Sequence, residues 1–180
     1  EGYDDTYFGD PDFNNTTLEA HIARVRVDHA LSQSWNLNGT VQFADYDKAY
    51  QNLYPVNFDA DAGTVTLDGY RDTTTRENAL VQLNLIGQFA TGDINHTLLT
   101  GMEYGSQDTE NTRRDAFFAD SQDDQVSFVF SDPLVIPSMT LTDPVRDRAS
   151  DVTFTSAFVQ DEIKLNENWI VVAGLRYDNF

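Results

Sequence analysis

The sequence predicts an all-β fold, an antiparallel up-and-down transmembrane β-barrel, and three observations support this. First, about six stretches alternate apolar and polar residues with a period of two, the pattern of strands with two different faces. Second, the connections between them go short, long, short, long, short. Third, no stretch approaches the roughly 18 apolar residues of a membrane-spanning helix. The stretches cover residues 19–31, 35–46, 76–89, 96–104, 152–165 and 169–177.

The first two stretches each separate an apolar face from a polar one. In residues 19–31, Val25 and Val27 alternate with Arg24 and Arg26, and the polar residues 32–34 follow as a short break. In residues 35–46 the polar face consists of amide and hydroxyl side chains, namely Asn38, Thr40 and Gln42. Both stretches therefore fit strands with one face in an apolar environment and one in a polar one.

A tight turn joins the third and fourth stretches within the segment FATGDINHTLLTGMEY, residues 89–104. The pair Gly92-Asp93 between two β-type segments is typical of a hairpin, so we expect a short turn over residues 90–95. The apolar face of the third stretch carries Ala79, Val81, Leu83, Leu85 and Phe89, and that of the fourth carries Leu98, Met102 and Tyr104.

The fifth stretch is less regular than the others. Asp161 falls on the face that also carries Val159 and Ile163, where a charge is unexpected. Residues 166–168 then turn the chain, and the last stretch alternates again, with Val171 and Leu175 on its apolar face.

The connections predict which kind of barrel this is. Residues 47–75 and 105–150 are long, irregular connections, and in an up-and-down sheet they lie at the opposite rim from the tight turns. Short turns at one rim and long loops at the other are the pattern of outer-membrane barrels, with the loops extracellular. The polar faces, rich in Asn, Gln, Thr, Gly and Arg, suit a hydrated lumen. A soluble all-β binding domain and a passive porin-like channel are the alternatives.

Charge and composition exclude several classes of function. The net charge of −19 and the pI near 4.1 argue against nucleic-acid binding, because phosphates would be repelled. There is no cysteine, and therefore no disulfide and no thiolate metal site. Neither an HExxH nor a GxSxG motif is present. We therefore expect no enzymatic activity, no metal site and no bound cofactor.

The long connections are rich in aromatic residues. Exposed rings on loops are unfavourable unless they become buried or meet a ligand, and tyrosine adds a hydrogen-bonding group to a large contact area. Tyr54, Phe117 and Phe118 are therefore candidate ligand contacts. Packing of one loop against another is the alternative for each of them.

Several segments, in order, resemble TonB-dependent siderophore receptors, most closely the ferrichrome (ferric hydroxamate) receptors. These are residues 89–104, the DFN at Asp12–Asn14, VDHALSQSW at Val27–Trp35, FVQDEIKLNENW at Phe158–Trp169 and GLRYD at Gly174–Asp178. The resemblance implies a barrel of about twenty-two strands around an N-terminal plug. It also implies an outer-membrane receptor of a Gram-negative bacterium that imports ferric siderophore with energy from the TonB complex. Outer-membrane lipid would surround the barrel.

On this resemblance we expect residues 1–180 to be a partial barrel domain without the plug, through which TonB would act. Alignment from Phe43–Asp45 brings Tyr54 onto a ligand-binding tyrosine, while Val56 replaces a second one. Alignment from residues 89–104 brings Phe118 onto a binding phenylalanine, with Phe117 beside it. The paired loop cysteines of the family are absent, so the identity of the siderophore stays open.

Overall fold

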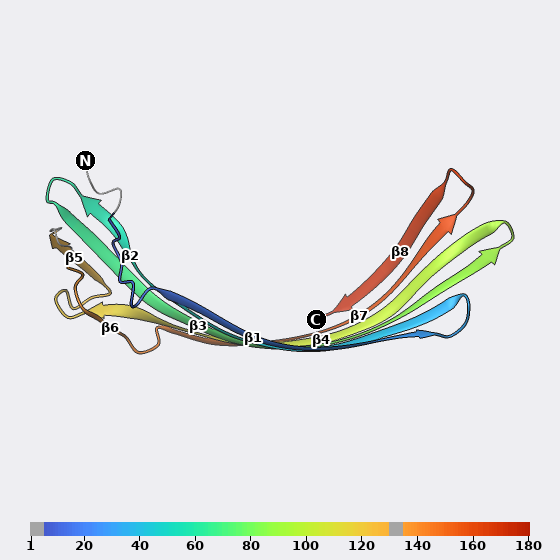
Figure 1. Cartoon of the computed structure of the whole chain (residues 1–180), viewed down its shortest axis with the longest axis horizontal. Coiled ribbons are helices and arrows are strands. Elements are labelled where there is room, and N and C mark those ends of the chain that lie inside the picture. The colour runs from blue at the N-terminus through green and yellow to red at the C-terminus, as the bar shows by residue number, and fades with distance from the viewer. Residues whose placement is uncertain (1–5, 130–134) are drawn as a thin grey trace. The chain divides into compact units, whose positions relative to one another are not determined.

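The computed structural model describes residues 6–129 and 135–180, and within them it contains eight β-strands (Figure 1). Six long strands form an antiparallel sheet in the order β1-β2-β3-β4-β7-β8, and two short strands pair with β3 and β4. No helix in the described ranges is long and apolar enough to cross a membrane. The strands are β1 (Asn15–Ala30), β2 (Trp35–Asp59), β3 (Thr64–Thr91), β4 (Ile94–Phe118), β5 (Gln125–Val129), β6 (Met139–Leu141), β7 (Arg146–Lys164) and β8 (Ile170–Asn179).

The chain divides into two compact units that share the long strands. The first, here called the loop unit, comprises Glu1–Ala20, Tyr46–Thr75 and Thr109–Ala149. The second, here called the turn unit, comprises His21–Asp45, Arg76–Asp108 and Ser150–Phe180. The three tight turns predicted from the sequence belong to the turn unit.

All three tight turns are confirmed. The Leu31 and Leu165 backbone N–H groups donate to the carbonyl oxygens of Trp35 and Trp169, at 2.8 and 3.0 Å, and so close the turns before β2 and β8. Between β3 and β4 the turn is only Gly92-Asp93. Gly92 has a φ of 63°, which a residue without a Cβ adopts at no steric cost.

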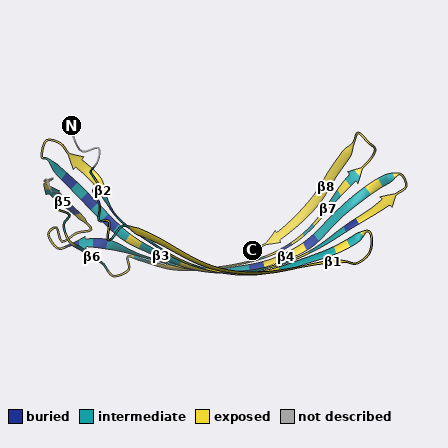
Figure 2. Ribbon diagram, viewed as in Figure 1, coloured by how far each residue is buried: buried dark blue, intermediate teal, exposed yellow. Residues whose placement is uncertain are grey.

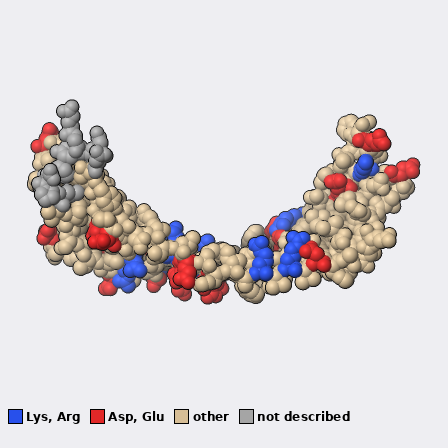
Figure 3. Space-filling view, viewed as in Figure 1, with Lys and Arg blue, Asp and Glu red and all other residues tan. Residues whose placement is uncertain are grey.

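The turn unit has the two faces that the alternation predicts. Large apolar side chains such as Val81 (44% exposed) and Leu83 (48%) project from one face. The other face carries a hydrogen-bonded polar network, in which Gln82 donates to Glu103 at 2.7 Å and Arg176 pairs with Glu103 at 2.7 Å. Most of the surface visible in Figure 3 is uncharged. An exposed apolar face opposite a hydrogen-bonded polar face is the arrangement expected of a membrane barrel.

The structure explains why Asp161 falls on the apolar side of its strand. Its Oδ2 lies 2.7 Å from Nδ1 of His96 on β4, and the His96 ring stacks on Phe89 at a centroid distance of 4.8 Å. The carboxylate therefore has a hydrogen-bonding partner on the neighbouring strand, which offsets the cost of placing a charge among apolar side chains.

The fold class is confirmed, but the bounds of the two long connections are wrong. Residues 47–75 are not irregular: β2 continues to Asp59 and β3 begins at Thr64, so only a short turn separates them. In the second connection β4 extends to Phe118 and β7 begins at Arg146, so only residues 119–145 lie between them. The alternation is hidden here because both faces of the sheet carry large side chains, as Leu53 and Tyr54 illustrate.

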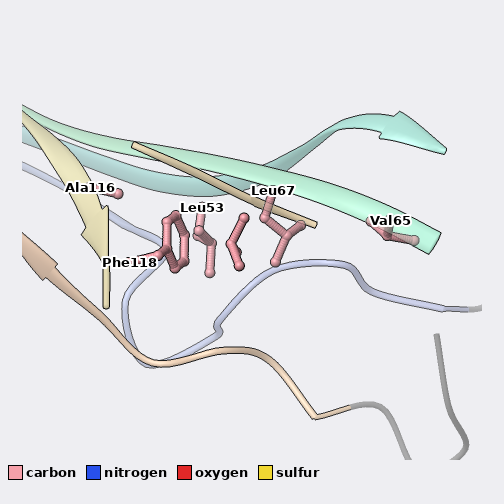
Figure 4. Close-up of a cluster of buried hydrophobic side chains, with 6 residues drawn as sticks. Leu53, Val65, Leu67, Ala116 and Phe118 are labelled. Atoms are coloured by element: carbon pink, nitrogen blue, oxygen red, sulfur yellow. The ribbon is translucent and has the colours of Figure 1, made fainter. Parts of the chain in front are cut away.

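The core of the loop unit is a cluster of buried apolar residues on one face of β2, β3 and β4. In Figure 4 the Phe118 ring lies beside Leu53, and Leu67 lies farther along the same cluster. Leu67 and Phe118 are fully buried. The other members are Leu53, Val65, Ala116 and Val126, with Phe8, Phe13, Phe128, Ile136 and Met139 packed against them. We call these six buried residues the apolar cluster.

The register of the short strands explains how the apolar cluster is covered. β5 runs antiparallel to the start of β3, with Val126 opposite Leu67, and β6 runs antiparallel to the end of β4, with Met139 opposite Phe118. By contrast, all residues of β1 and β8 are exposed, and β8 is uniformly yellow in Figure 2. Each of these two strands has one neighbour in the sheet.

Candidate functional site

Three tyrosines of the loop unit gather on neighbouring strands. Tyr50 and Tyr54 come from β2 and Tyr70 from β3. The rings of Tyr50 and Tyr70 lie 5.7 Å apart, and those of Tyr54 and Tyr70 lie 6.0 Å apart at 82°. The edge-to-face arrangement of Tyr54 and Tyr70 is favourable for aromatic pairs. On β3, Tyr70 is even-numbered and alternates with Val65 and Leu67, so it lies on the face opposite the apolar cluster.

Arg113 of β4 completes this group, which we call the tyrosine site (Tyr50, Tyr54, Tyr70 and Arg113). Its guanidinium carbon lies 3.9 Å from the centroid of the Tyr70 ring, a distance for strong cation–π attraction. Arg113 also pairs with Asp115 at 2.8 Å and with Asp72 at 3.6 Å. The two carboxylates fix the planar guanidinium over the ring and offset its charge.

A second arginine balances the remaining acidic charge. Nη2 of Arg146 pairs with Asp72 at 2.7 Å, and its Nε donates to the side-chain oxygen of Asn111 at 3.1 Å. Arg113 and Arg146 thus meet Asp72 and Asp115 in one network with no excess of positive charge.

Two phenols of the site, those of Tyr54 and Tyr70, hold their protons more tightly than a free tyrosine, because the pKa of each is raised. Burial, followed by the negative charge of Asp68, raises the pKa of Tyr54. Burial, followed by the neighbouring Tyr50, raises the pKa of Tyr70. The hydrogen bond to Asp115 raises the pKa of Arg113, which stays charged. The site therefore offers neutral hydroxyl groups that donate hydrogen bonds, together with one fixed cation.

A cavity of about 520 Å³ adjoins two of these tyrosines. It lies between the segment before β1 and residues 50–55 of β2. Asn14 fastens that segment to the strand, since its side chain accepts from the Leu53 backbone N–H at 2.6 Å and donates to the Leu53 carbonyl at 2.9 Å. The volume is in the range of small-molecule sites.

The structure separates the three residues that the sequence singled out. Tyr54 belongs to the tyrosine site. Phe117 and Phe118 are adjacent on β4 and point to opposite faces: Phe117 is half-buried, on the face of Arg113, and Phe118 is fully buried in the apolar cluster. Both lie at a strand end paired with β6 rather than in an irregular loop.

Sequence reasoning missed Tyr50, Tyr70 and Arg113 as site residues. The usable signal was the two-residue alternation continued beyond residue 46, which places Tyr50 and Tyr54 on one face of β2. The contact between Tyr70 and Arg113 joins residues far apart in sequence, and no local sequence pattern predicts it.

The Asp-rich segment at Asp59 serves as a turn. Oδ1 of Asp59 accepts hydrogen bonds from the backbone N–H groups of Asp61 and Ala62 at 2.9 and 3.0 Å. Among residues 6–129 and 135–180, no group of three or more His, Cys, Asp or Glu side chains is arranged to hold a metal ion.

Comparison with known proteins places the fold in a family. A model described as "TonB dependent receptor-like, beta-barrel" matches residues 1–180. The chain belongs to this family of outer-membrane β-barrels of Gram-negative bacteria. The expectation of an outer-membrane location is therefore confirmed.

Relatives of this receptor segment include two curated proteins. It is 25% identical to the probable TonB-dependent siderophore receptor PiuA of Acinetobacter baumannii, over 97% of this chain and 26% of that protein. It is 26% identical to the metal-pseudopaline receptor CntO of Pseudomonas aeruginosa (strain UCBPP-PA14), over 97% of this chain and 24% of that protein. The chain thus spans about a quarter of the length of these relatives, both of which are receptors rather than enzymes.

Solved structures share the fold of the segment. The crystal structure of PiuA matches 96% of this chain and 27% of its own, with a TM-score of 0.70 and 24% identity. The open form of the ferric-catecholate import receptor Fiu from E. coli K12 matches 96% of this chain and 27% of its own, with a TM-score of 0.76 and 16% identity. The closer resemblance to ferrichrome receptors stays a prediction.

Proposed function

We propose that this chain is part of an outer-membrane receptor that imports a ferric siderophore with energy from the TonB complex. The observation that carries the proposal is the match of the whole chain to the receptor barrel family, together with an organised aromatic site in the loop unit. Coupling to TonB would pass through an N-terminal plug, outside this chain.

The alternation along β3 supports a site that opens into the barrel. Tyr70 and Asp72 are even-numbered, as are Gln82 and Asn84, and β3 is continuous from Thr64 to Thr91. The polar residues of a barrel strand face the lumen, and long loops lie on the extracellular side. The tyrosine site would therefore face the lumen near its extracellular mouth, while Val81 and its apolar neighbours contact lipid.

The charges around the site favour a neutral ferric chelate. Arg113 and Arg146 are both occupied by carboxylates, and Asp68 is close enough to Tyr54 to act on its pKa. A trianionic chelate would be repelled here, whereas a compact neutral ferric hydroxamate would pack on the rings and accept hydrogen bonds from the phenols.

Of the three aromatic residues that the sequence singled out, Tyr54 and Phe117 are proposed as ligand contacts and Phe118 as a residue that supports them. Tyr54 and Phe117 would contact the chelate. Phe118, fully buried on the other face, would hold the end of β4 in place behind Phe117.

The test uses the intact receptor in cells that lack other siderophore receptors. Binding of a radiolabelled ferric trihydroxamate at low temperature should weaken in Tyr54→Ala and in Phe117→Ala. Tyr104→Ala, which removes an exposed tyrosine from the apolar face of the turn unit, is the matched control and should bind normally. Uptake at growth temperature should stop in a strain without TonB.

The outcomes separate the parts of the proposal. Normal binding in Tyr54→Ala and Phe117→Ala would reject the site but leave the transport function in place. Uptake that continues without TonB would reject energised import and favour a passive porin-like channel.

A further inference from the structure

Two arginines of the loop unit lie on the neighbouring strands β3 and β4, and among residues 6–129 and 135–180 no carboxylate lines the cavity that they share. Arg71 and Thr73 of β3, with Thr112 and Arg114 of β4, line a cavity of about 310 Å³. The Thr73 hydroxyl donates to the Thr112 carbonyl at 3.5 Å, which marks these residues as cross-strand neighbours. Like charges in such positions destabilise a sheet unless something offsets them.

This cavity is separate from the tyrosine site. Arg71 and Thr73 are odd-numbered on β3 and alternate with Tyr70 and Asp72, so they lie on the other face of the strand, the face of Val65 and Leu67. On β4, Arg114 alternates with Arg113 in the same way. The cavity therefore adjoins the apolar cluster and takes no part in the proposed siderophore site.

The charge pattern of the cavity is unusual for this chain. The net charge is −19, and on the other face Arg113 and Arg146 both pair with carboxylates. Within residues 6–129 and 135–180, neither Arg71 nor Arg114 forms an ion pair. The nearby Asp147 instead accepts from the Thr112 hydroxyl at 3.2 Å. An anion from outside the chain would supply the missing negative charge.

One arginine is already held in position. Nη1 of Arg114 donates to the Thr142 carbonyl at 2.9 Å, which orients the guanidinium and leaves its Nε and Nη2 groups outside that bond. A guanidinium offers donors in a planar fork that matches the oxygens of a phosphate, and two such forks around one cavity suit a group with several anionic oxygens.

We propose that Arg71 and Arg114, with Thr73 and Thr112 at the cavity wall, form a binding site for a phosphate group. The phosphate would be free inorganic phosphate or the phosphate of a lipid headgroup. Each arginine would donate two hydrogen bonds to it. Asp147 lowers the affinity, because its negative charge lies beside the site.

The experiment measures phosphate binding to the intact receptor in detergent at low ionic strength. Inorganic phosphate titrated by calorimetry should bind to the wild type. The Arg71→Gln/Arg114→Gln double variant should lose about tenfold or more in affinity, since it removes charge-assisted hydrogen bonds from both arginines. Asp147→Asn should bind phosphate more tightly than the wild type. Arg148→Gln, which removes an exposed arginine of the same unit that does not line the cavity, is the control and should bind like the wild type.

A second arm identifies the source of the phosphate. Phosphorylated outer-membrane lipid that copurifies with the receptor is quantified by its phosphorus content. In parallel, the lipid is treated with phosphatase, and its retention by the receptor is measured again. Loss of the lipid in the double variant and after dephosphorylation supports a headgroup site. Binding of inorganic phosphate without lipid retention supports a site for the free anion. The proposal is overturned if the double variant binds both probes as well as the wild type does, or if the wild type binds neither probe. Circular dichroism confirms that the variants are folded.

Discussion

Replacing Phe118 by Ala tests whether this residue supports the ligand site or contacts the ligand. The Phe118 ring is fully buried against side chains from β2, β3 and β5, namely Leu53, Leu67 and Val126. Its removal leaves a cavity that strands held by their own backbone hydrogen bonds cannot collapse to fill. Substitutions of this kind cost about 3–5 kcal/mol. We therefore expect local opening around β5 and the end of β4 to become about two to four orders of magnitude more frequent.

Hydrogen exchange of the intact receptor, read by mass spectrometry, measures this opening. Peptides that cover Gln125–Val129 and the end of β4 should exchange faster in Phe118→Ala, while peptides of β8 stay unchanged. Val129→Ala is the control, because Val129 is 67% exposed and its loss should change little. Unchanged exchange in Phe118→Ala combined with lost siderophore binding would refute the reasoning, since the ring would then act on the ligand directly.

Three further predictions concern other residues. Gly101→Ala should destabilise the sheet by about 1–3 kcal/mol, because a Cβ there would lie 2.8 Å from the Leu83 carbonyl oxygen. Gly39→Ala is the control and should be tolerated, because a Cβ there would lie 3.6 Å from its nearest neighbour. The melting temperatures of the two variants measure the difference. Arg113→Gln should weaken binding of the ferric chelate and Arg113→Lys should restore part of it; equal binding by all three proteins would contradict the cation–π contact. Burial, then the hydrogen bond that the protonated Asp124 carboxyl donates to Asp123, raises the pKa of Asp124. The folded state therefore holds this proton more tightly than the unfolded state and loses that stability as the pH rises through the folded-state pKa. Asp124→Asn should therefore protect the segment before β5 from proteolysis at neutral pH and have little effect in acid, and equal protection at both pH values would count against it.

The alternation of apolar and polar residues predicted the turn unit well, because every strand of this unit has one apolar face and one polar face. Each strand there separates an apolar surface from a polar network, so Val81 and Gln82 must point in opposite directions. Leu80 and Ile86 are apolar exceptions on the polar face of the third stretch. The charged exception, Asp161, depends on His96, a residue 65 positions away, and no local pattern shows that partnership.

The loop unit was harder to predict because its strands carry large, partly buried side chains on both faces. Leu53 packs into the apolar cluster while Tyr54 joins the tyrosine site, so consecutive residues are both large and both partly covered. Without alternation, the sequence predicts irregular loops where the structure has continuous strands. The resemblance to receptors singled out Tyr54, but the stacking of Arg113 on Tyr70 depends on the register between β3 and β4, which only the structure supplies.

The extended β2–β3 hairpin has a consequence for how a ligand would be bound. Its end is closed by the side chain of Asp59 and by Gly63, with a φ of 63°, and its two strands carry Tyr54 and Tyr70. Ordering a flexible loop costs about 1–2 kcal/mol of conformational entropy per residue. In a hairpin this entropy is lost during folding and not when the ligand binds. A ligand would thus meet rings that are already in place. Differences in affinity between chelates should then arise from their fit to these rings and appear mainly in dissociation rates, with association rates nearly constant.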